Sequence, residues 1–393
     1  MTAPVRIALV AGEHSGDQLG AGLIRALRSR LPDAEFFGVA GPRMTAEGCA
    51  PWAAADRLAV MGLFEVLKHL PDLIALRADI TRRLIAARPD VFVGVDAPEF
   101  NLGLARRLRR AGIRTVQYVS PQVWAWRRGR VHGIARAVDS VLCLLPFEAD
   151  FYGHAGVHAE FVGHPLADQI PLVPDRAGAR AQLGLADRIT VAVLPGSRMG
   201  EVTRLGDAFA GAVAWLNERR PDIQFVAPMA NARARAHFEH VLAKHAAGVP
   251  VKLLNGESQS ALAAADAVIV ASGTATLEAL FSKRPMVVAY RVGAMTAWLV
   301  RSFKLMKAPF FAHPNLLAGR EVVPELFQEA VTPEAIGSAI LHQLEDAAGR
   351  REIETTFTRI HEQMRQGANE RAATAVMNLL SQPGAANSAA PRT

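Results

Sequence analysis

Carboxylates, hydroxyls and arginines stand in this sequence at the points where apolar runs end. Asp96 directly follows the apolar residues 91–95 and precedes Ala97 and Pro98. A carboxylate fixed at the end of a strand, before a turn stiffened by proline, suits a general base that removes a proton from a hydroxyl. An aspartate that caps the next helix is the alternative. We therefore predict Asp96 as a candidate catalytic base.

A serine and an arginine follow the apolar residues 189–194. The turn Pro-Gly-Ser-Arg places Ser197 and Arg198 ahead of an expected helix. A hydroxyl, a planar guanidinium and the N-terminus of a helix all favour a bound phosphate. An ordinary turn between a strand and a helix is the alternative. We predict this turn as a phosphate site.

A third polar group, Ser272, Thr274 and Glu278, follows the apolar residues 267–270. The hydroxyls of Ser272 and Thr274 suit either a helix cap or a diphosphate. Glu278 stands one turn into the expected helix, where its carboxylate could accept hydrogen bonds from two ribose hydroxyls. These residues extend the predicted phosphate site to a nucleotide.

The first loop of the chain has a different composition. Glu13, Ser15 and Asp17 follow the apolar residues 5–10, where a nucleotide-binding fold would place its phosphate turn. Two carboxylates disfavour phosphate, which needs backbone N–H groups and positive charge. The composition therefore points to a ligand other than phosphate.

A basic stretch lies in the first half of the chain. Residues 101–136 hold nine arginines and no Asp or Glu, within a formal net charge of +7. They suit nucleic acid, anionic lipid headgroups or phosphorylated metabolites, or form a solvated helix at 104–110. No nucleic-acid-binding module accompanies them, so no nucleic acid partner is expected. Trp124 and Trp126 in this stretch suit a sugar or an acyl groove, with core packing as the alternative.

Strands and helices alternate along the whole chain, which predicts parallel sheets covered by helices. The expected strands are residues 5–10, 35–39, 91–95, 114–119, 140–144 and 160–162, then 189–194, 224–227, 251–254, 267–270 and 286–289. The expected helices are residues 18–30, 62–87 with a candidate break at Pro71, 102–111, 205–219, 232–244, 258–265, 274–283, 333–344 and 351–380. The predicted fold class is α/β, with two doubly wound Rossmann-like domains that face a cleft.

The domain boundaries follow from a proline-stiffened linker at residues 168–176. We expect domains at residues 1–168 and 177–345, a C-terminal helical segment at 346–381 and a disordered tail at 382–393. The C-terminal helices are expected to pack back on the N-terminal domain or on a partner subunit.

Composition restricts the class of protein. Half of the 393 residues are hydrophobic and 21% are charged, which is typical of an ordered globular chain. The chain has two cysteines and no apolar segment long enough to span a membrane, so we expect a cytoplasmic protein without disulfides. It has no Asp-x-Asp pair and no histidines at metal-ligand spacing. We therefore expect no metal and no other cofactor. If the chain transfers a glycosyl group, arginine, hydroxyls and helix dipoles would stabilise the leaving diphosphate.

Eight segments together resemble one family. They are AGEHSGD, AGPRM with EGC after it, MGLFEVL, VDAPEFN, YVSPQVWAWR, LPGSR, ASGTATLEAL and PNLLAGREVVPEL. Their order is that of the lipid-A-disaccharide synthase family, and the resemblance runs from about residue 5 to residue 380. It implies a GT-B glycosyltransferase of Gram-negative bacteria, and it implies that relatives form homodimers.

The resemblance also implies a reaction and residue roles. The family joins UDP-2,3-diacylglucosamine to 2,3-diacylglucosamine 1-phosphate, which gives the β-1,6-linked lipid A disaccharide and UDP. Asp96 matches the proposed general base and Arg198 the arginine needed for donor binding, while Asn315 and Glu13 match positions thought to line the site. Glu99 stands where some relatives carry Asp. In this scheme Glu13, Ser15 and Asp17 lie in the acceptor-side domain, and residues 177–345 bind the UDP-sugar.

Two rival functions stay open. One is another GT-B enzyme acting on a UDP-N-acetylhexosamine, of the peptidoglycan glycosyltransferase or epimerase type. The peptidoglycan enzyme is expected to carry a run of glycines in its first loop, whereas this loop sets Gly12 and Gly16 among acids. The other rival is a nucleotide-sugar sensor without catalytic activity.

Acylated substrates imply contact with a membrane surface. Leu63, Phe64 and Leu67, continued by Leu70, form an apolar helical stripe beside Lys68. A second candidate is residues 298–307, where bulky apolar side chains alternate with cations. Core packing of both segments is the alternative. We expect peripheral association with the cytoplasmic face of the inner membrane.

Overall fold

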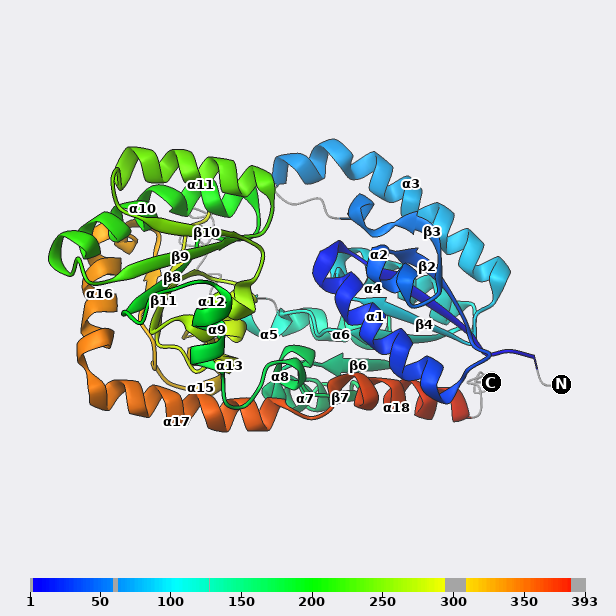
Figure 1. Cartoon of the computed structure of the whole chain (residues 1–393). Coiled ribbons are helices and arrows are strands. Elements are labelled where there is room, and N and C mark those ends of the chain that lie inside the picture. The colour runs from blue at the N-terminus through cyan, green and yellow to red at the C-terminus, as the bar shows by residue number, and fades with distance from the viewer. Residues whose placement is uncertain (1–2, 59–62, 127, 294–308, 383–393) are drawn as a thin grey trace. The chain divides into compact units, whose positions relative to one another are not determined.

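The computed structural model describes residues 3–58, 63–126, 128–293 and 309–382, and the chain divides into two compact units. The N-terminal unit contains Met1–Pro165 and Met364–Thr393, and the C-terminal unit contains Leu166–Gln363. Each unit is built on a parallel sheet covered by helices (Figure 1). The predicted α/β class with two Rossmann-like domains is confirmed.

Within the described residues, the sheet of the N-terminal unit has seven parallel strands in the order β3-β2-β1-β4-β5-β6-β7. The strands are β1 (Arg6–Ala11), β2 (Glu35–Ala40), β3 (Cys49–Ala54), β4 (Val91–Val95), β5 (Arg114–Tyr118), β6 (Ser140–Cys143) and β7 (Ala159–Phe161). The order reverses between the neighbours β1 and β4. Ligands bind open α/β sheets beyond the carboxyl ends of the strands at such a point, which is where Glu13 and Asp96 follow their strands.

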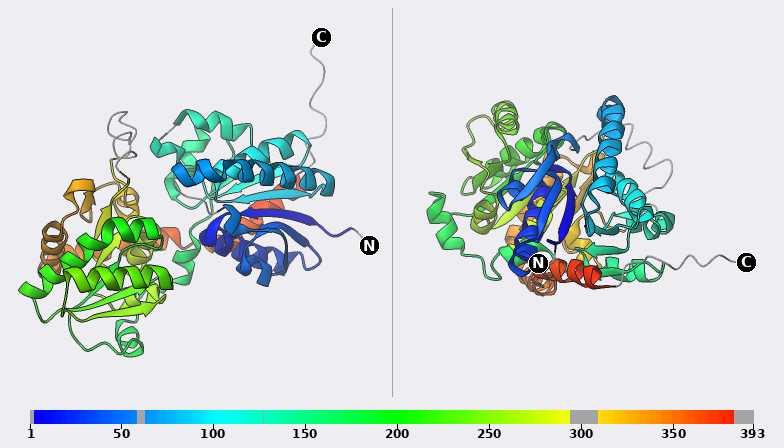
Figure 2. Two further views of the ribbon diagram at one scale, coloured as in Figure 1. Left: turned by 90° about the horizontal axis from the view of Figure 1, so that it is seen from above. Right: turned by 90° about the vertical axis from the view of Figure 1, so that its right-hand side faces the viewer.

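Helices cover both faces of this sheet (Figure 2). Ile7 and Leu9 of β1 point into a core with α1 (Glu13–Arg30), α2 (Pro42–Ala46) and α18 (Ala368–Ser381). Ala8 and Val10 point the other way, into a core built by α3 (Leu63–Ala87), α4 (Pro98–Arg110), α6 (Val131–Ala135) and α7 (Pro146–Gly153). The alternation along β1 thus serves both faces. The predicted return of C-terminal helices to the N-terminal domain is confirmed for α18.

The C-terminal unit repeats the architecture. Its sheet has, among the residues described, six parallel strands in the order β10-β9-β8-β11-β12-β13. They are β8 (Thr190–Leu194), β9 (Gln224–Met229), β10 (Val251–Asn255), β11 (Ala267–Ala271), β12 (Met286–Tyr290) and β13 (Glu325–Phe327). One core contains the helices α10 (Met199–Arg219), α11 (Ala232–His245) and α16 (Pro333–Glu345). Among the described residues of this unit, the remaining helices of seven residues or more are α9 (Arg176–Gln182), α12 (Ser258–Ala264), α13 (Ala275–Phe281) and α17 (Ala347–Met364), whose last residue belongs to the other unit.

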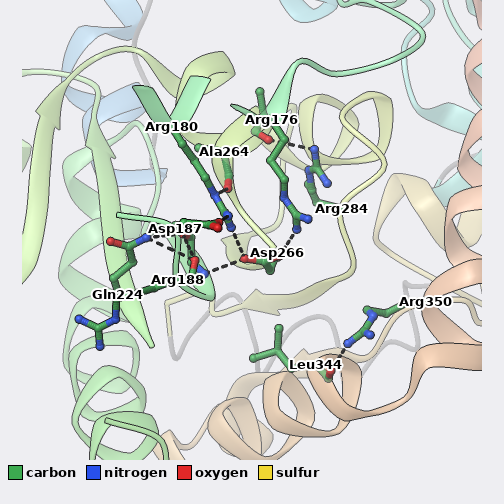
Figure 3. A network of polar contacts seen from close by, with 12 residues as sticks. Arg176, Arg180, Asp187, Arg188, Gln224, Ala264, Asp266, Arg284, Leu344 and Arg350 are labelled. Carbon is green, nitrogen blue, oxygen red and sulfur yellow. Dashed lines mark hydrogen bonds and ion pairs between the residues drawn. The ribbon is translucent and has the colours of Figure 1, made fainter. Parts of the chain in front are cut away.

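Charged contacts fix α9 to the amino ends of the strands in this unit (Figure 3). Asp266, just before β11, pairs with Arg176 and with Arg180 at 2.7 Å, and it accepts a hydrogen bond from the backbone of Thr190 at 2.8 Å. The Arg180 and Asp266 side chains are only 13% and 18% exposed, so removing one of them leaves a largely buried charge without its partner. The segment after the linker is therefore held to its own sheet.

Several boundaries differ from the predictions. Helix α1 begins at Glu13 rather than residue 18, and α3 continues through Pro71 without a break. Residues 351–380 form two helices rather than one, since α17 ends at Met364 and Gly367, with φ 68°, is the N-cap of α18. Strands β3 and β13 were not predicted. The tail from residue 383 and the segment 298–307 lie outside the described residues.

Candidate functional site

Asp96 lies in an unusual turn at the carboxyl end of β4. Asp96 has φ 53° and Ala97 has φ 41°, both in the left-handed region that favours glycine. The Asp96 backbone N–H donates to the carbonyl of Tyr118 at 2.8 Å. The N-cap position of α4 belongs to Ala97 rather than Asp96. Non-glycine residues in this conformation concentrate at functional sites, which supports a functional role for the turn.

The first loop lies against this turn. A Cβ added at Gly12 would be 2.8 Å from the Cβ of Ala97, so only glycine lets the two loops approach so closely. Glu13 follows with φ 61° and is half-buried, and Ser15 is exposed. The structure thus places the Glu13 loop beside the Asp96 turn.

Asp17 has a different role from the one predicted. It is 1% exposed, and its carboxylate accepts backbone hydrogen bonds from Gly41 at 2.9 Å, Arg43 at 2.9 Å and Met44 at 3.0 Å. These N–H groups start α2 and would otherwise lack partners. In this structure the Asp17 carboxylate thus holds the start of α2, and its contact with an acceptor sugar stays a prediction.

An open cavity of about 380 Å³ lies at the ends of β2 and β3. Its lining is mostly apolar, with Thr45 and Asp56 as polar members, and it includes Gly41, Pro42, Trp52 and the alanines at positions 53–55. Trp52 stacks on Phe37 with ring centroids 4.8 Å apart. The cavity offers apolar surface within the N-terminal unit.

Trp124 is held by a buried carboxyl group. Its Nε1 donates to Oε1 of Glu148 at 3.0 Å, and its ring meets Phe147 edge to face at 4.9 Å. Glu148 is 3% exposed and also accepts from the Leu145 backbone at 3.1 Å. Burial raises the pKa of Glu148 to about 7. Trp124 therefore packs inside the N-terminal unit, while the side chain of Trp126 lies outside the described residues.

The raised pKa of Glu148 predicts a pH-dependent stability. Between pH 4.5, the ordinary pKa of the group, and about 7, the folded chain keeps a proton that the unfolded chain has released. The free energy of unfolding should therefore fall as pH rises through this window. Glu148→Gln removes the effect, so its melting temperature relative to the original chain should rise from pH 4.5 to 7.5. A constant difference in thermal melts would contradict the assignment.

The Pro-Gly-Ser-Arg turn exposes Ser197 and Arg198 at the start of α10. Both backbone N–H groups donate to Oε2 of Glu201, at 3.0 and 3.3 Å. The Arg198 guanidinium lies 3.3 Å from the other oxygen of Glu201. An internal carboxylate therefore already satisfies these amides, so an incoming phosphate would have to meet the exposed side chains or displace Glu201.

The second loop of this unit places its hydroxyls at the surface or half-buried. Thr274 is exposed and its side chain makes no cap hydrogen bond with α13, and Ser272 is half-buried. Glu278 accepts from Ser258 Oγ at 2.8 Å, and burial raises its pKa. Thr274 thus occupies the N-cap position of α13, but its hydroxyl does not cap the helix.

Asn315 is buried and fully engaged. In α15 (His313–Ala318), its Nδ2 donates to the Val323 carbonyl at 2.9 Å and to Glu325 at 2.8 Å. Its Oδ1 accepts from the backbones of Val322 and Val323, at 2.7 and 3.0 Å. The Asn315 amide thus holds the segment that leads into β13, and its contact with the donor stays a prediction.

A match to a family of known proteins covers almost the whole chain. Residues 7–378 match the family model described as lipid-A-disaccharide synthetase. The chain belongs to the lipid-A-disaccharide synthase family. Among family members, the enzyme of Chromohalobacter salexigens is 53% identical over 377 residues, which cover 96% of this chain and 97% of that protein. The enzyme of Pseudomonas aeruginosa is also 53% identical, over 96% of this chain and 98% of its own length.

Solved structures share the fold of this family member at low sequence identity. The glycosyltransferase of kitacinnamycin superposes with a TM-score of 0.64 and 19% identity, over 96% of this chain and 99% of that one. The UDP-GlcNAc 2-epimerase from Neisseria meningitidis, bound to UDP-GlcNAc, gives 0.63 and 10% over the same shares. The likeness supports the GT-B fold and no more than the fold.

Four residues that support the candidate site residues or lie near them were not predicted from the sequence. Asn101 and Gln117 contact the backbone of Asp96, and Glu148 holds Trp124. His313 lies 3.1 Å from Thr276 Oγ1, and burial lowers its pKa to about 4, so its ring is neutral. Of these four residues, only Asn101 lies in one of the eight segments that carry the family resemblance. Among the described residues no group of three or more His, Cys, Asp or Glu could hold a metal ion, and no described helix is long and apolar enough to cross a membrane.

Proposed function

We propose that this chain carries out the reaction of its family. It transfers the diacylglucosaminyl group of UDP-2,3-diacylglucosamine to 2,3-diacylglucosamine 1-phosphate, and it releases UDP and the β-1,6-linked lipid A disaccharide 1-phosphate. The observation that carries the proposal is family membership: residues 7–378 match the family model, and a named enzyme is 53% identical in sequence over 377 residues. The strained turn at Asp96, with its left-handed backbone, supports the proposal that Asp96 is the general base of this reaction.

The mechanism is a single inverting displacement. Asp96 removes the proton from the 6-hydroxyl of the acceptor, and the oxygen attacks the anomeric carbon of the donor from the face opposite UDP. The bond to the diphosphate oxygen breaks as the new glycosidic bond forms. Arg198 and the hydroxyls of Ser197, Ser272 and Thr274 stabilise the charge that develops on UDP, without a divalent cation.

The remaining residues bind the two substrates. Glu278 accepts hydrogen bonds from the ribose hydroxyls of the donor, which then compete with Ser258 for its carboxylate. Glu13 and Ser15 bind the acceptor sugar beside Asp96. The apolar cavity at the ends of β2 and β3 takes part of an acceptor acyl chain.

One assay tests the function and separates its rivals. Radiolabelled UDP-diacylglucosamine is offered to the protein with and without the acceptor, and with EDTA in a parallel reaction. Disaccharide that forms only with acceptor, and also in EDTA, supports the proposal. Conversion of the donor alone would favour an epimerase-type enzyme, and binding without turnover would favour a sensor. An unchanged acceptor KM in Glu13→Ala would remove Glu13 from the acceptor site.

Peripheral binding to the inner membrane is the proposed location of the reaction. Leu63, Phe64 and Leu67 lie on α3, although their side chains are outside the described residues. One and two turns further, Leu70 and Ile74 are 41% and 50% exposed, which supports an apolar stripe that meets lipid rather than core.

Paired substitution Phe64→Ser with Leu67→Ser tests this stripe. We expect the variant to lose flotation with anionic liposomes while its melting temperature stays unchanged. A collapse of the melting temperature would identify the stripe as core and overturn the proposal. The homodimer implied by the family resemblance stays a prediction, which sedimentation equilibrium tests.

A further inference from the structure

Two buried carboxamides meet at one carbonyl oxygen, that of Asp96. Nδ2 of Asn101, in α4, donates to this oxygen at 2.8 Å. Nε2 of Gln117, in β5, donates to it at 3.0 Å. Both side chains are 0% exposed. The peptide that follows Asp96 is therefore held from two different elements.

The backbone there needs such support. Asp96 and Ala97 are consecutive non-glycine residues in the left-handed region, with φ of 53° and 41°. This conformation is unfavourable for residues with a Cβ and persists only where the surroundings impose it. The Asp96 N–H is also fixed, by its hydrogen bond to the Tyr118 carbonyl. Both polar groups of the Asp96 backbone are thus engaged.

The orientation of the two amides toward the Asp96 carbonyl leaves their own oxygens without hydrogen bonds from the described part of the chain. Oδ1 of Asn101 and Oε1 of Gln117 are buried without a hydrogen-bond partner among the described residues. Their N–H groups donate to carbonyls of the described residues, which besides Asp96 are those of Val10 and Val95 for Asn101 and of Tyr118 and Val119 for Gln117. A buried orphan acceptor destabilises a fold, so an apolar side chain would serve packing better.

Strand β4 leaves room for the pair. A Cβ added at Gly94 would lie 2.8 Å from the Cβ of Asn101 and 3.1 Å from Oε1 of Gln117. The first distance is shorter than real Cβ contacts allow. Glycine at this place in a fully buried strand weakens the strand, and a close approach of neighbouring groups accounts for it.

We propose that Asn101 and Gln117 are positioning residues, which hold the strained Asp96 turn so that the Asp96 carboxylate stays in place for proton abstraction. The inference rests on the proposed function, because it assigns the two amides to the base of that reaction. Neither amide contacts substrate. Their effect on rate passes through the position of Asp96.

Gln117→Leu tests the inference, and Gln343→Leu is its matched control. Gln343 is a second buried amide, 8% exposed, which donates to the Met286 carbonyl at 3.0 Å and also leaves its Oε1 without a partner among the described atoms. It lies in α16 of the C-terminal unit and has no role in the proposed reaction. We expect Gln117→Leu to lower kcat by about 10- to 100-fold with little change in the KM of the donor, since small misplacements of reacting groups have effects of this size. Gln343→Leu should keep the original kcat.

A double variant separates positioning from general damage. In the Asp96→Asn background, Gln117→Leu should cause little further loss of kcat, because the base it positions is already absent. A full additional loss would overturn the inference, as would an unchanged kcat in a folded Gln117→Leu. An unimpaired Asp96→Asn would instead refute the proposed base. If Gln117→Leu does not fold, Asn101→Asp replaces the other donor with an oxygen, and the same cycle with Asp96→Asn decides.

Discussion

Asp96→Asn should lose about 10²- to 10⁴-fold in turnover, the usual contribution of a general base. Asparagine has nearly the shape of aspartate but its amide does not take up a proton. The backbone contacts of residue 96 with Tyr118, Asn101 and Gln117 involve only main-chain atoms of this residue, so they survive the change. The loss should therefore appear in kcat and leave UDP binding intact.

Glu99→Gln is the control for this variant. Glu99 lies three residues further along, its side chain is 77% exposed, and it pairs with Arg130 at 2.6 Å. A surface pair of this kind contributes little to stability, so the control should keep its turnover. Disaccharide formation measures kcat, and calorimetric titration measures UDP affinity. An Asp96→Asn protein with normal turnover would remove Asp96 from the mechanism.

Arg198→Ala should weaken UDP binding by about 10- to 100-fold, the range expected for charge-assisted hydrogen bonds to a phosphate. Turnover should fall with it, because in the proposed mechanism the same guanidinium stabilises the charge that grows on the leaving diphosphate. The fold should tolerate the change, since Arg198 is half-exposed and its pair with Glu201 is at the surface.

Arg219→Ala serves as the comparison. This arginine ends the same helix, α10, and packs over the ring of Trp215 at 3.9 Å. It has no role in the proposed site, so UDP affinity should match that of the original chain. Titration of UDP into both variants measures the difference. Equal UDP affinity of Arg198→Ala and the original chain would show that Arg198 does not contact the donor.

The sequence predicted most elements because their hydrophobic runs are clear. β4 was predicted with its observed bounds, since Val91–Val95 is an uninterrupted apolar run. β3 was missed because Cys49–Ala54 contains a proline and three alanines and leaves several side chains exposed at the edge of the sheet. β13 has only three residues, all half-buried, which is too short for an alternation of apolar and polar side chains to be recognised in the sequence.

The site was harder to predict because a sequence does not name the partner of a polar side chain. Asp17 and Asn315 looked like ligand-binding residues, yet backbone N–H groups or carbonyls of other segments satisfy them. The partners of Asp17 begin 24 residues away. Asn101 and Gln117 were passed over for the opposite reason, since an amide inside a helix or a strand carries no visible signal until its neighbours are known.

The return of α18 to the N-terminal unit has a consequence for biosynthesis. Ala372, Ala373 and Val376 complete the core that also contains Ile7 and Leu9 of the first strand. On the ribosome, the unit whose synthesis starts first is therefore the last to be finished, after the whole of Leu166–Gln363 has emerged. Protease resistance of nascent chains should appear in the C-terminal unit before the N-terminal one. A chain that stops before residue 364 would lack α18, so the defect would lie in the N-terminal unit, where one face of the first sheet would lose part of its cover.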